Sequence, residues 1–177
     1  CFSKAVANGM PLSVLTGRAD VMRLLDEEVF FFTTFGGEAL SLAAARATLL
    51  ELRDRKVPAE LARQGQKLQA GYEQLAAEKG LRGTQVLGAG CRSLISFDPA
   101  VGDPLLQKSL VQQELLRHGV LWSGFHNLSF SHSDADVEHV LGAYDRALSV
   151  LSRALRENNL AQCLRGRPVQ PVLRKTR

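Results

Sequence analysis

The sequence predicts an α/β fold that continues into a smaller α+β layer. Three observations lead to this prediction: a short apolar strand pattern near the start, two long helical patterns in the middle, and alternating strand and helix patterns in the rest. They divide the 177 residues into three parts. Residues 1–50 would end a larger α/β body, residues 51–160 would form the α+β layer, and residues 161–177 are a basic tail.

The first part contains one strand pattern and two helix patterns. Residues 12–16 form a short apolar run bounded by proline and glycine, which predicts a buried strand. We expect a short helix over 18–25 and a long helix over 38–56. The first half of this long helix is small and apolar on all sides, so it should be buried, and Val57-Pro58 should end it.

Helix and strand patterns alternate in the second part. The last helix has the clearest signals, because Ser133 is a good N-cap and Asp134 and Asp136 suit the positive end of the helix dipole. Its apolar residues then recur on one face from Val137 to Leu155. The other expected elements are helices over 59–79 and 104–118 and strands over 84–87, 92–98, 120–122 and 128–130.

Composition and charge exclude some classes of protein. The apolar fraction of 45% and the charged fraction of 23% are typical of globular proteins. The net charge is +4, but five positive charges lie after Ala161, so the rest of the chain carries −1. We therefore expect no nucleic-acid partner and a solvated basic tail. We also expect no membrane partner, because no apolar run approaches the ~18 residues that a crossing helix needs.

The cysteines and histidines predict no metal site. Cys1, Cys91 and Cys163 lie far apart and form neither a CxxC pair nor a disulfide framework. This pattern favours a reducing, cytoplasmic location. His126 and His132 have no cysteine or carboxylate partner at ligand spacing.

Lys4 is the main candidate for chemistry. It ends a short apolar run and is followed by a glycine-containing turn and a second apolar run. Apolar neighbours would desolvate the ammonium, which lowers its pKa and makes the amine a better nucleophile. Such a lysine forms Schiff bases with aldehyde cofactors. The alternative is an ordinary solvated lysine on the surface.

A second candidate is the Thr-Thr-Phe-Gly-Gly segment, residues 33–37, which precedes the long helix. Threonine hydroxyls beside glycine amides make a corner that binds anions, although the same residues could form an ordinary N-cap and loop. Phe30, Phe31 and Phe32 come just before it and are interpreted as core. A reactive lysine and a separate phosphate corner are what pyridoxal 5'-phosphate requires.

These segments resemble a known family. The run from Phe2 to Arg18 looks like the cofactor-lysine segment of the class III pyridoxal-phosphate aminotransferases, and within them is most similar to the glutamate-1-semialdehyde 2,1-aminomutases. Residues 34–40 are similar to the family's Thr-x-x-Gly-Asn-Pro-Leu stretch. Residues 119–122 and 130–137 match its C-terminal strand and the start of its last helix. The resemblance covers nearly the whole chain except the basic tail.

The resemblance implies roles for four residues. Lys4 would hold pyridoxal phosphate as a Schiff base and would act as general acid and base. Thr34 would hydrogen-bond the cofactor phosphate of the neighbouring subunit, so a homodimer is implied. His126 and Asn127 would lie near the carboxylate end of the substrate. The fold implied is the C-terminal portion of a fold-type-I enzyme, with the end of its large cofactor domain and its small C-terminal domain.

The implied reaction is amino-group transfer, or its intramolecular form, between small-molecule amino donors and acceptors. Glu38 and Ala39 replace the family's Asn and Pro, and this bears on substrate class more than on cofactor use. The chain begins at Cys1, so we expect it to be the back part of a longer protein and to be inactive alone. Two alternatives stay open: an aminotransferase of a sugar or other cell-surface precursor, and a non-catalytic remnant that serves as a dimerisation or scaffold piece.

Overall fold

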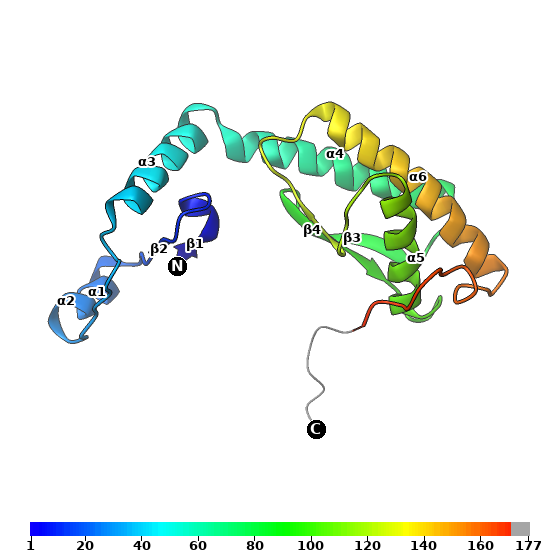
Figure 1. Cartoon of the computed structure of the whole chain (residues 1–177), viewed down its shortest axis with the longest axis horizontal. Coiled ribbons are helices and arrows are strands. Elements are labelled where there is room, and N and C mark those ends of the chain that lie inside the picture. Colours follow the sequence, from blue (N-terminus) through cyan, green and yellow to red (C-terminus); the bar gives the residue numbers. More distant parts are fainter. Residues whose placement is uncertain (171–177) are drawn as a thin grey trace, which may run out of the picture. The chain divides into compact units, whose positions relative to one another are not determined.

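The computed structural model describes residues 1–170. The last three basic residues of the predicted tail, Arg174, Lys175 and Arg177, lie outside these described residues. The chain divides into two compact units, one comprising Cys1–Val57 and the other beginning at Pro58 (Figure 1).

The first unit is built on a small hairpin and a long helix. Strands β1 (Phe2–Ser3) and β2 (Ser13–Val14) pair antiparallel, with Phe2 opposite Val14. A 3-10 turn, η1 (Lys4–Val6), follows β1 directly. The strand predicted over 12–16 is thus confirmed, but it is only two residues long and is not fully buried.

Three helices complete the first unit. The single helix predicted over 18–25 is in fact two short helices, α1 (Ala19–Met22) and α2 (Leu24–Glu27). The predicted long helix is confirmed as α3 (Ala39–Asp54). Val57-Pro58, which was expected to end this helix, lies beyond its end at Asp54 and begins the next helix instead. A proline in the first turn of a helix needs no hydrogen-bond donor.

Very little of the first unit is buried. Its buried residues are Ala7, Ser41, Ala45 and Val57. The expectation that the first half of α3 is buried on most sides is wrong, because Leu40 and Leu42 are exposed. The interpretation of the three phenylalanines as core is also wrong. The exposed fractions are 94% for Phe30, 67% for Phe31 and 73% for Phe32. These residues lie in a loop that no helix or strand of this unit covers.

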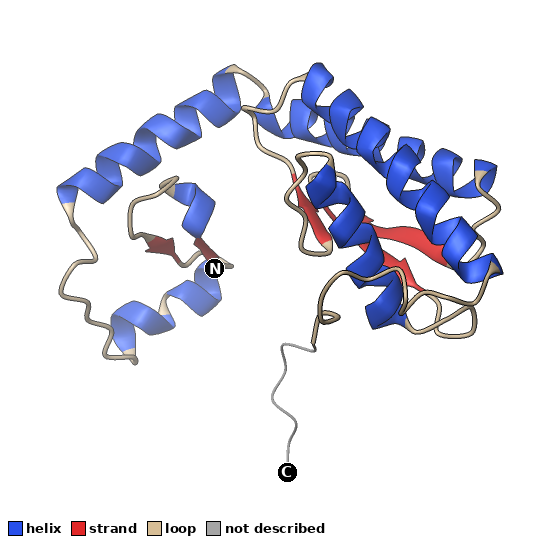
Figure 2. Ribbon diagram, turned by 45° about the vertical axis from the view of Figure 1, so that its right-hand side comes forward, coloured by secondary structure: helices blue, strands red, loops and turns tan. Residues whose placement is uncertain are grey.

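The second unit contains an antiparallel sheet in the order β3-β4-β5. The strands are β3 (Thr84–Ala89), β4 (Arg92–Phe97) and β5 (Phe125–Asn127), as Figure 2 shows in red. Val86 pairs with Ile95, and Ser93 pairs with His126. The first two strands were predicted within two residues of their ends.

The strands predicted over 120–122 and 128–130 are wrong, because β5 lies between them. The apolar run at 120–122 completes the end of a helix instead: the Val120 amide donates to the Leu115 carbonyl, next to Gly119 with a φ of +77°. Such a bond with a left-handed glycine is a common helix C-cap. The Val120 amide is therefore already hydrogen-bonded and cannot pair with a neighbouring strand.

The other layer of this unit consists of three helices, α4 (Val57–Glu78), α5 (Pro104–Arg117) and α6 (Asp134–Arg156). Their buried residues join the inward face of the sheet in one hydrophobic core, centred on Tyr72, Leu110, Tyr144 and Leu148. The outward row of Leu87, Leu94 and Phe125 stays exposed. Helices on one face of an antiparallel sheet make the predicted α+β layer.

The chain after α6 is anchored to α5. Cys163 and Leu164 pack against the core, and Gln113 donates to the Cys163 carbonyl at 3.1 Å. The Val169 amide donates to Ser109 Oγ at 2.9 Å. As far as Val169 the predicted tail is therefore held by side chains of α5, whereas its basic residues Arg165 and Arg167 are exposed to solvent as predicted.

The described residues, 1–170, contain neither a candidate membrane span nor a metal-binding cluster. Within this range no helix combines the length and apolar character that crossing a bilayer requires. No three His, Cys, Asp or Glu side chains of the described chain are grouped as a metal site would need. All three cysteines are free thiols.

Candidate active site

Lys4 lies where β1 passes into η1. Its backbone φ is +57°, in the left-handed region that a non-glycine residue avoids. Its side chain is exposed, and no hydrogen bond or ion pair joins its amine to the described residues. The expected desolvation is wrong for this unit, because the neighbouring Val6 and Val14 line a groove along α3 and leave the lysine uncovered.

The segment before α3 combines a tight turn with a charged cap. A Cβ atom on Gly36 would lie 2.0 Å from Thr33 Oγ1, so only glycine allows this hydroxyl to approach so closely. Glu38 caps the helix: one carboxylate oxygen accepts from the Leu40 amide and the other from the Ser41 amide, both at 2.7 Å. These amides lower the pKa of Glu38, so the carboxylate is charged at neutral pH.

Two interpretations of this segment were open, an anion-binding corner and an ordinary helix N-cap. The structure shows an N-cap, which Glu38 provides. The amides that could have bound an external anion at the start of α3 already bind Glu38. Thr34 is exposed, and no hydrogen bond joins its hydroxyl to the described residues. An external phosphate would thus meet threonine hydroxyls here, with the capping carboxylate close by in sequence.

His126 and Asn127 lie next to each other on β5 in the second unit, and successive residues of a strand point to opposite faces. His126 is buried, with Nδ1 2.9 Å from Ser93 Oγ and Nε2 2.7 Å from Tyr144 OH. Burial lowers its pKa to about 4, so the ring is neutral at physiological pH. Asn127 is exposed. A substrate bound by His126 would have to displace one of its two partners.

A cavity of about 310 Å³ lies beside β5, and both residues contribute to its wall. This volume is at the lower end of the range for small-ligand sites. Sequence reasoning did not assign the other polar residues that line it to a binding site, because they come from the loops on either side of β5 and from α6. They are Trp122, His132, Asp136 and His139.

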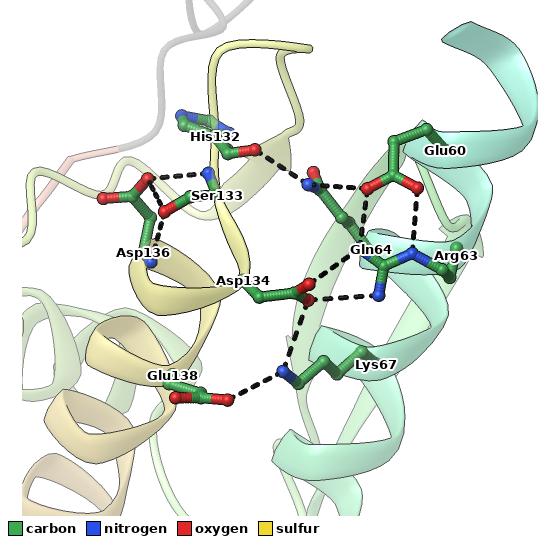
Figure 3. Close-up of polar contacts among 9 residues, drawn as sticks. All are labelled: Glu60, Arg63, Gln64, Lys67, His132, Ser133, Asp134, Asp136 and Glu138. Atoms are coloured by element: carbon green, nitrogen blue, oxygen red, sulfur yellow. Dashed lines mark hydrogen bonds and ion pairs between the residues drawn. The ribbon is translucent and has the colours of Figure 1, made fainter. Parts of the chain in front are cut away.

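A polar network between α4 and α6 holds the segment after β5 (Figure 3). Gln64 donates to the His132 carbonyl at 2.7 Å. Arg63 donates to both oxygens of Asp134, at 3.0 and 3.1 Å. The predicted N-cap is confirmed: Ser133 and Asp136 exchange backbone and side-chain bonds in a capping box. The wall of the cavity is therefore fixed at one end by α4.

Comparison with solved structures defines the class of protein. The FumI protein of Sphingopyxis sp. MTA144, in its internal aldimine form with pyridoxal phosphate, matches with a TM-score of 0.73 and 28% identity. The match covers 85% of this chain and 36% of that one. The predicted fold class, that of the pyridoxal-phosphate transaminases, is thus confirmed.

The sequence comparisons then give the family. A family model described as "Aminotransferase class-III" matches residues 1–135, and the chain belongs to this family. The putrescine aminotransferase of Pectobacterium atrosepticum is 36% identical over 123 residues, or 68% of this chain and 26% of that protein. Glutamate-1-semialdehyde 2,1-aminomutase 1 of Bacillus cereus is 28% identical over 164 residues, or 85% and 38%. The chain thus spans between about a quarter and two fifths of these relatives.

The cofactor of the family is pyridoxal phosphate. The first unit offers side chains of the right chemistry for two of its groups. The aldehyde needs a primary amine that is free to react, and Lys4 carries one on a defined turn. The phosphate needs hydrogen-bond donors, and Thr34 has a hydroxyl without a partner among the described residues.

Proposed function

We propose that this chain supplies the cofactor lysine and the small domain of a class III enzyme that transfers amino groups. The observation that carries the proposal is the exposed, unpartnered amine of Lys4 on a left-handed turn, within the segment that the family model matches. In this proposal residues 1–50 end the large domain and residues 51–160 form the small one. The division of the chain into compact units near Pro58 supports such an arrangement.

Lys4 has two roles in the proposed reaction. Its amine binds the cofactor covalently, and after the substrate replaces it the same amine moves a proton at the substrate carbon. When bound, pyridoxal phosphate supplies the electron sink for this chemistry. A single exposed amine next to a fixed backbone turn suits both roles, because it can leave and return without refolding.

Thr34 and the phenylalanine loop are proposed to act across a homodimer. Thr34 would donate its hydroxyl to the cofactor phosphate of the neighbouring subunit. The exposed side chains of Phe30, Phe31 and Phe32 support a contact here, because adjacent large apolar groups are seldom left in water. A second copy of the protein would cover them.

The proposed substrates are small amines and carbonyl compounds. Relatives with related sequences carry names as different as putrescine aminotransferase and glutamate-1-semialdehyde aminomutase, so the proposal stops at this class. Asn127 is the better placed of the two predicted substrate residues, since its amide is exposed whereas His126 has two partners in the core. A cytoplasmic location stays a prediction from the cysteine pattern.

Reductive trapping tests the proposal directly. The protein that carries this chain is incubated with pyridoxal phosphate, reduced with borohydride and digested, and the label is located by mass spectrometry. We expect the label at Lys4, and we expect Lys4→Arg to lose both label and amino transfer from a small diamine. Equal labelling of Lys108, a lysine of α5 in the second unit, would contradict the proposal.

A further inference from the structure

The backbone around Lys4 is unusual at three points. Lys4, Asn8 and Gly9 have φ values of +57°, +45° and +113°. Glycine accepts such angles freely and asparagine tolerates them, so the strain lies at Lys4, and a strained residue persists only where its surroundings hold it. Strain at the residue that carries a reactive amine indicates that the direction of its side chain is imposed by neighbouring residues.

Both ends of the segment that carries Lys4 are anchored. On one side Ser3 pairs with Ser13 across the hairpin. On the other side Ala7 is 1% exposed, the most buried residue of the first unit after Ser41. The Ala7 amide donates to the Lys4 carbonyl at 3.4 Å, and its carbonyl accepts from the Met10 amide at 3.3 Å. Lys4 therefore lies in a short segment whose ends, Ser3 and Ala7, are both held in place.

The turn next to this second anchor packs on α3 beside small residues. The turn η1 lies against α3, and Val6 shares an apolar groove with Ala45 of that helix. The two buried residues of α3 itself are small, Ser41 and Ala45. Ala7 is 1% exposed, so a larger side chain at position 7 would have to displace the atoms that cover it and would disturb the turn.

We propose that Ala7 is the positioning residue for Lys4: its buried methyl group seats the turn on α3 and so sets the direction of the lysine amine. This inference rests on the proposed role of Lys4. Ala7 touches neither cofactor nor substrate in this proposal. It acts through the backbone of Ala5 and Val6, the two residues that separate it from Lys4.

The test compares the same substitution at two sites of the turn. Ala7→Leu enlarges the buried residue, and Ala5→Leu makes the same change at an exposed residue two positions away. In the protein that carries this chain, we measure the rate of borohydride-trapped pyridoxal phosphate at Lys4. We also measure the one-bond Cα–Hα coupling of Lys4 without cofactor, because this coupling reports the sign of φ. Ala7→Val is the milder variant if Ala7→Leu does not fold.

We expect Ala7→Leu to slow labelling about tenfold or more and to lose the positive φ. Ala5→Leu should stay within about twofold of the unchanged protein, as surface substitutions do. Ala7→Ser introduces a side chain of nearly the same size. It should keep the labelling rate and the Lys4 coupling of the unchanged protein. The inference is overturned if Ala7→Leu and Ala7→Val keep the coupling and the labelling rate, or if Ala5→Leu loses as much. Absence of label in the unchanged protein would refute the role of Lys4, and the coupling would still decide the role of Ala7.

Discussion

His126 Nε2 lies 2.7 Å from Tyr144 OH, and the two rings meet edge to face in the core of the second unit. Ser93 bonds the other ring nitrogen, so the imidazole joins β4, β5 and α6. Tyr144 in turn packs edge to face on Tyr72, with ring centroids 5.0 Å apart. A neutral histidine therefore serves as a polar link inside an otherwise apolar core.

The first prediction is that acid destabilises this core. The pKa of His126 is about 4 in the fold against a usual 6.5, so below pH 6.5 the unfolded chain binds a proton that the folded chain does not. The free energy of unfolding should therefore be unaffected by this ring above pH 6.5 and should fall as the pH decreases toward 4. The total loss is about 3 kcal/mol at most.

Urea unfolding between pH 4 and pH 7 checks this prediction. The single tryptophan, Trp122, is buried beside Tyr144 and so reports on the second unit by its fluorescence. His126→Gln is the control and should flatten the pH dependence in this range. A slope that stays the same in this variant would assign the effect to other groups.

The second prediction concerns two tyrosine hydroxyls. Tyr144→Phe leaves a buried ring nitrogen of His126 without its partner and should cost about 1–3 kcal/mol of unfolding free energy. Tyr72→Phe is the matched control, because its hydroxyl bonds Thr84 Oγ1 at 2.6 Å, a hydroxyl that can turn toward another acceptor or water. It should cost less. Equal losses in urea unfolding would argue against a special role for the histidine link.

The third prediction tests the strain at Lys4. Lys4→Gly and Lys4→Ala both remove the amine, but only glycine accepts a φ of +57° freely. The glycine variant should therefore be more stable in the first unit by about 1 kcal/mol. Hydrogen exchange of the β1–β2 amides measures the difference. Faster exchange in the glycine variant would show that the left-handed backbone carries no strain.

The fourth prediction concerns the contact of α4 with the β3–β4 turn. A Cβ atom on Gly65 would lie 2.0 Å from the Gly90 carbonyl oxygen, and backbone cannot move aside as a side chain can. Gly65→Ala should destabilise the second unit by about 1–3 kcal/mol. Gly142→Ala in α6 is the control: it meets only the end of Arg146 at 4.0 Å, and helix propensity should stabilise it by up to about 1 kcal/mol. Thermal unfolding that ranks the two variants the other way would refute the clash.

What sequence alone determined here is mostly local. The start of α6 could be predicted because Ser133 and Asp136 bond each other and the free amides within one helical turn. The hairpin strands β3 and β4 could be predicted because their alternation and the glycine turn lie within fourteen residues of each other. Lys4 could be singled out because its motif is a short continuous run.

Tertiary structure decided the rest. β5 was missed because it is three residues long and exists through its pairing with β4, about thirty residues earlier. The apolar run at 120–122 resembles a strand, but its first amide closes α5. The exposure of Lys4 and Phe30, like the burial of His126, depends on which distant residues cover them. Hydrogen bonds within a turn are determined by neighbours in sequence, whereas burial is a property of the whole packed chain.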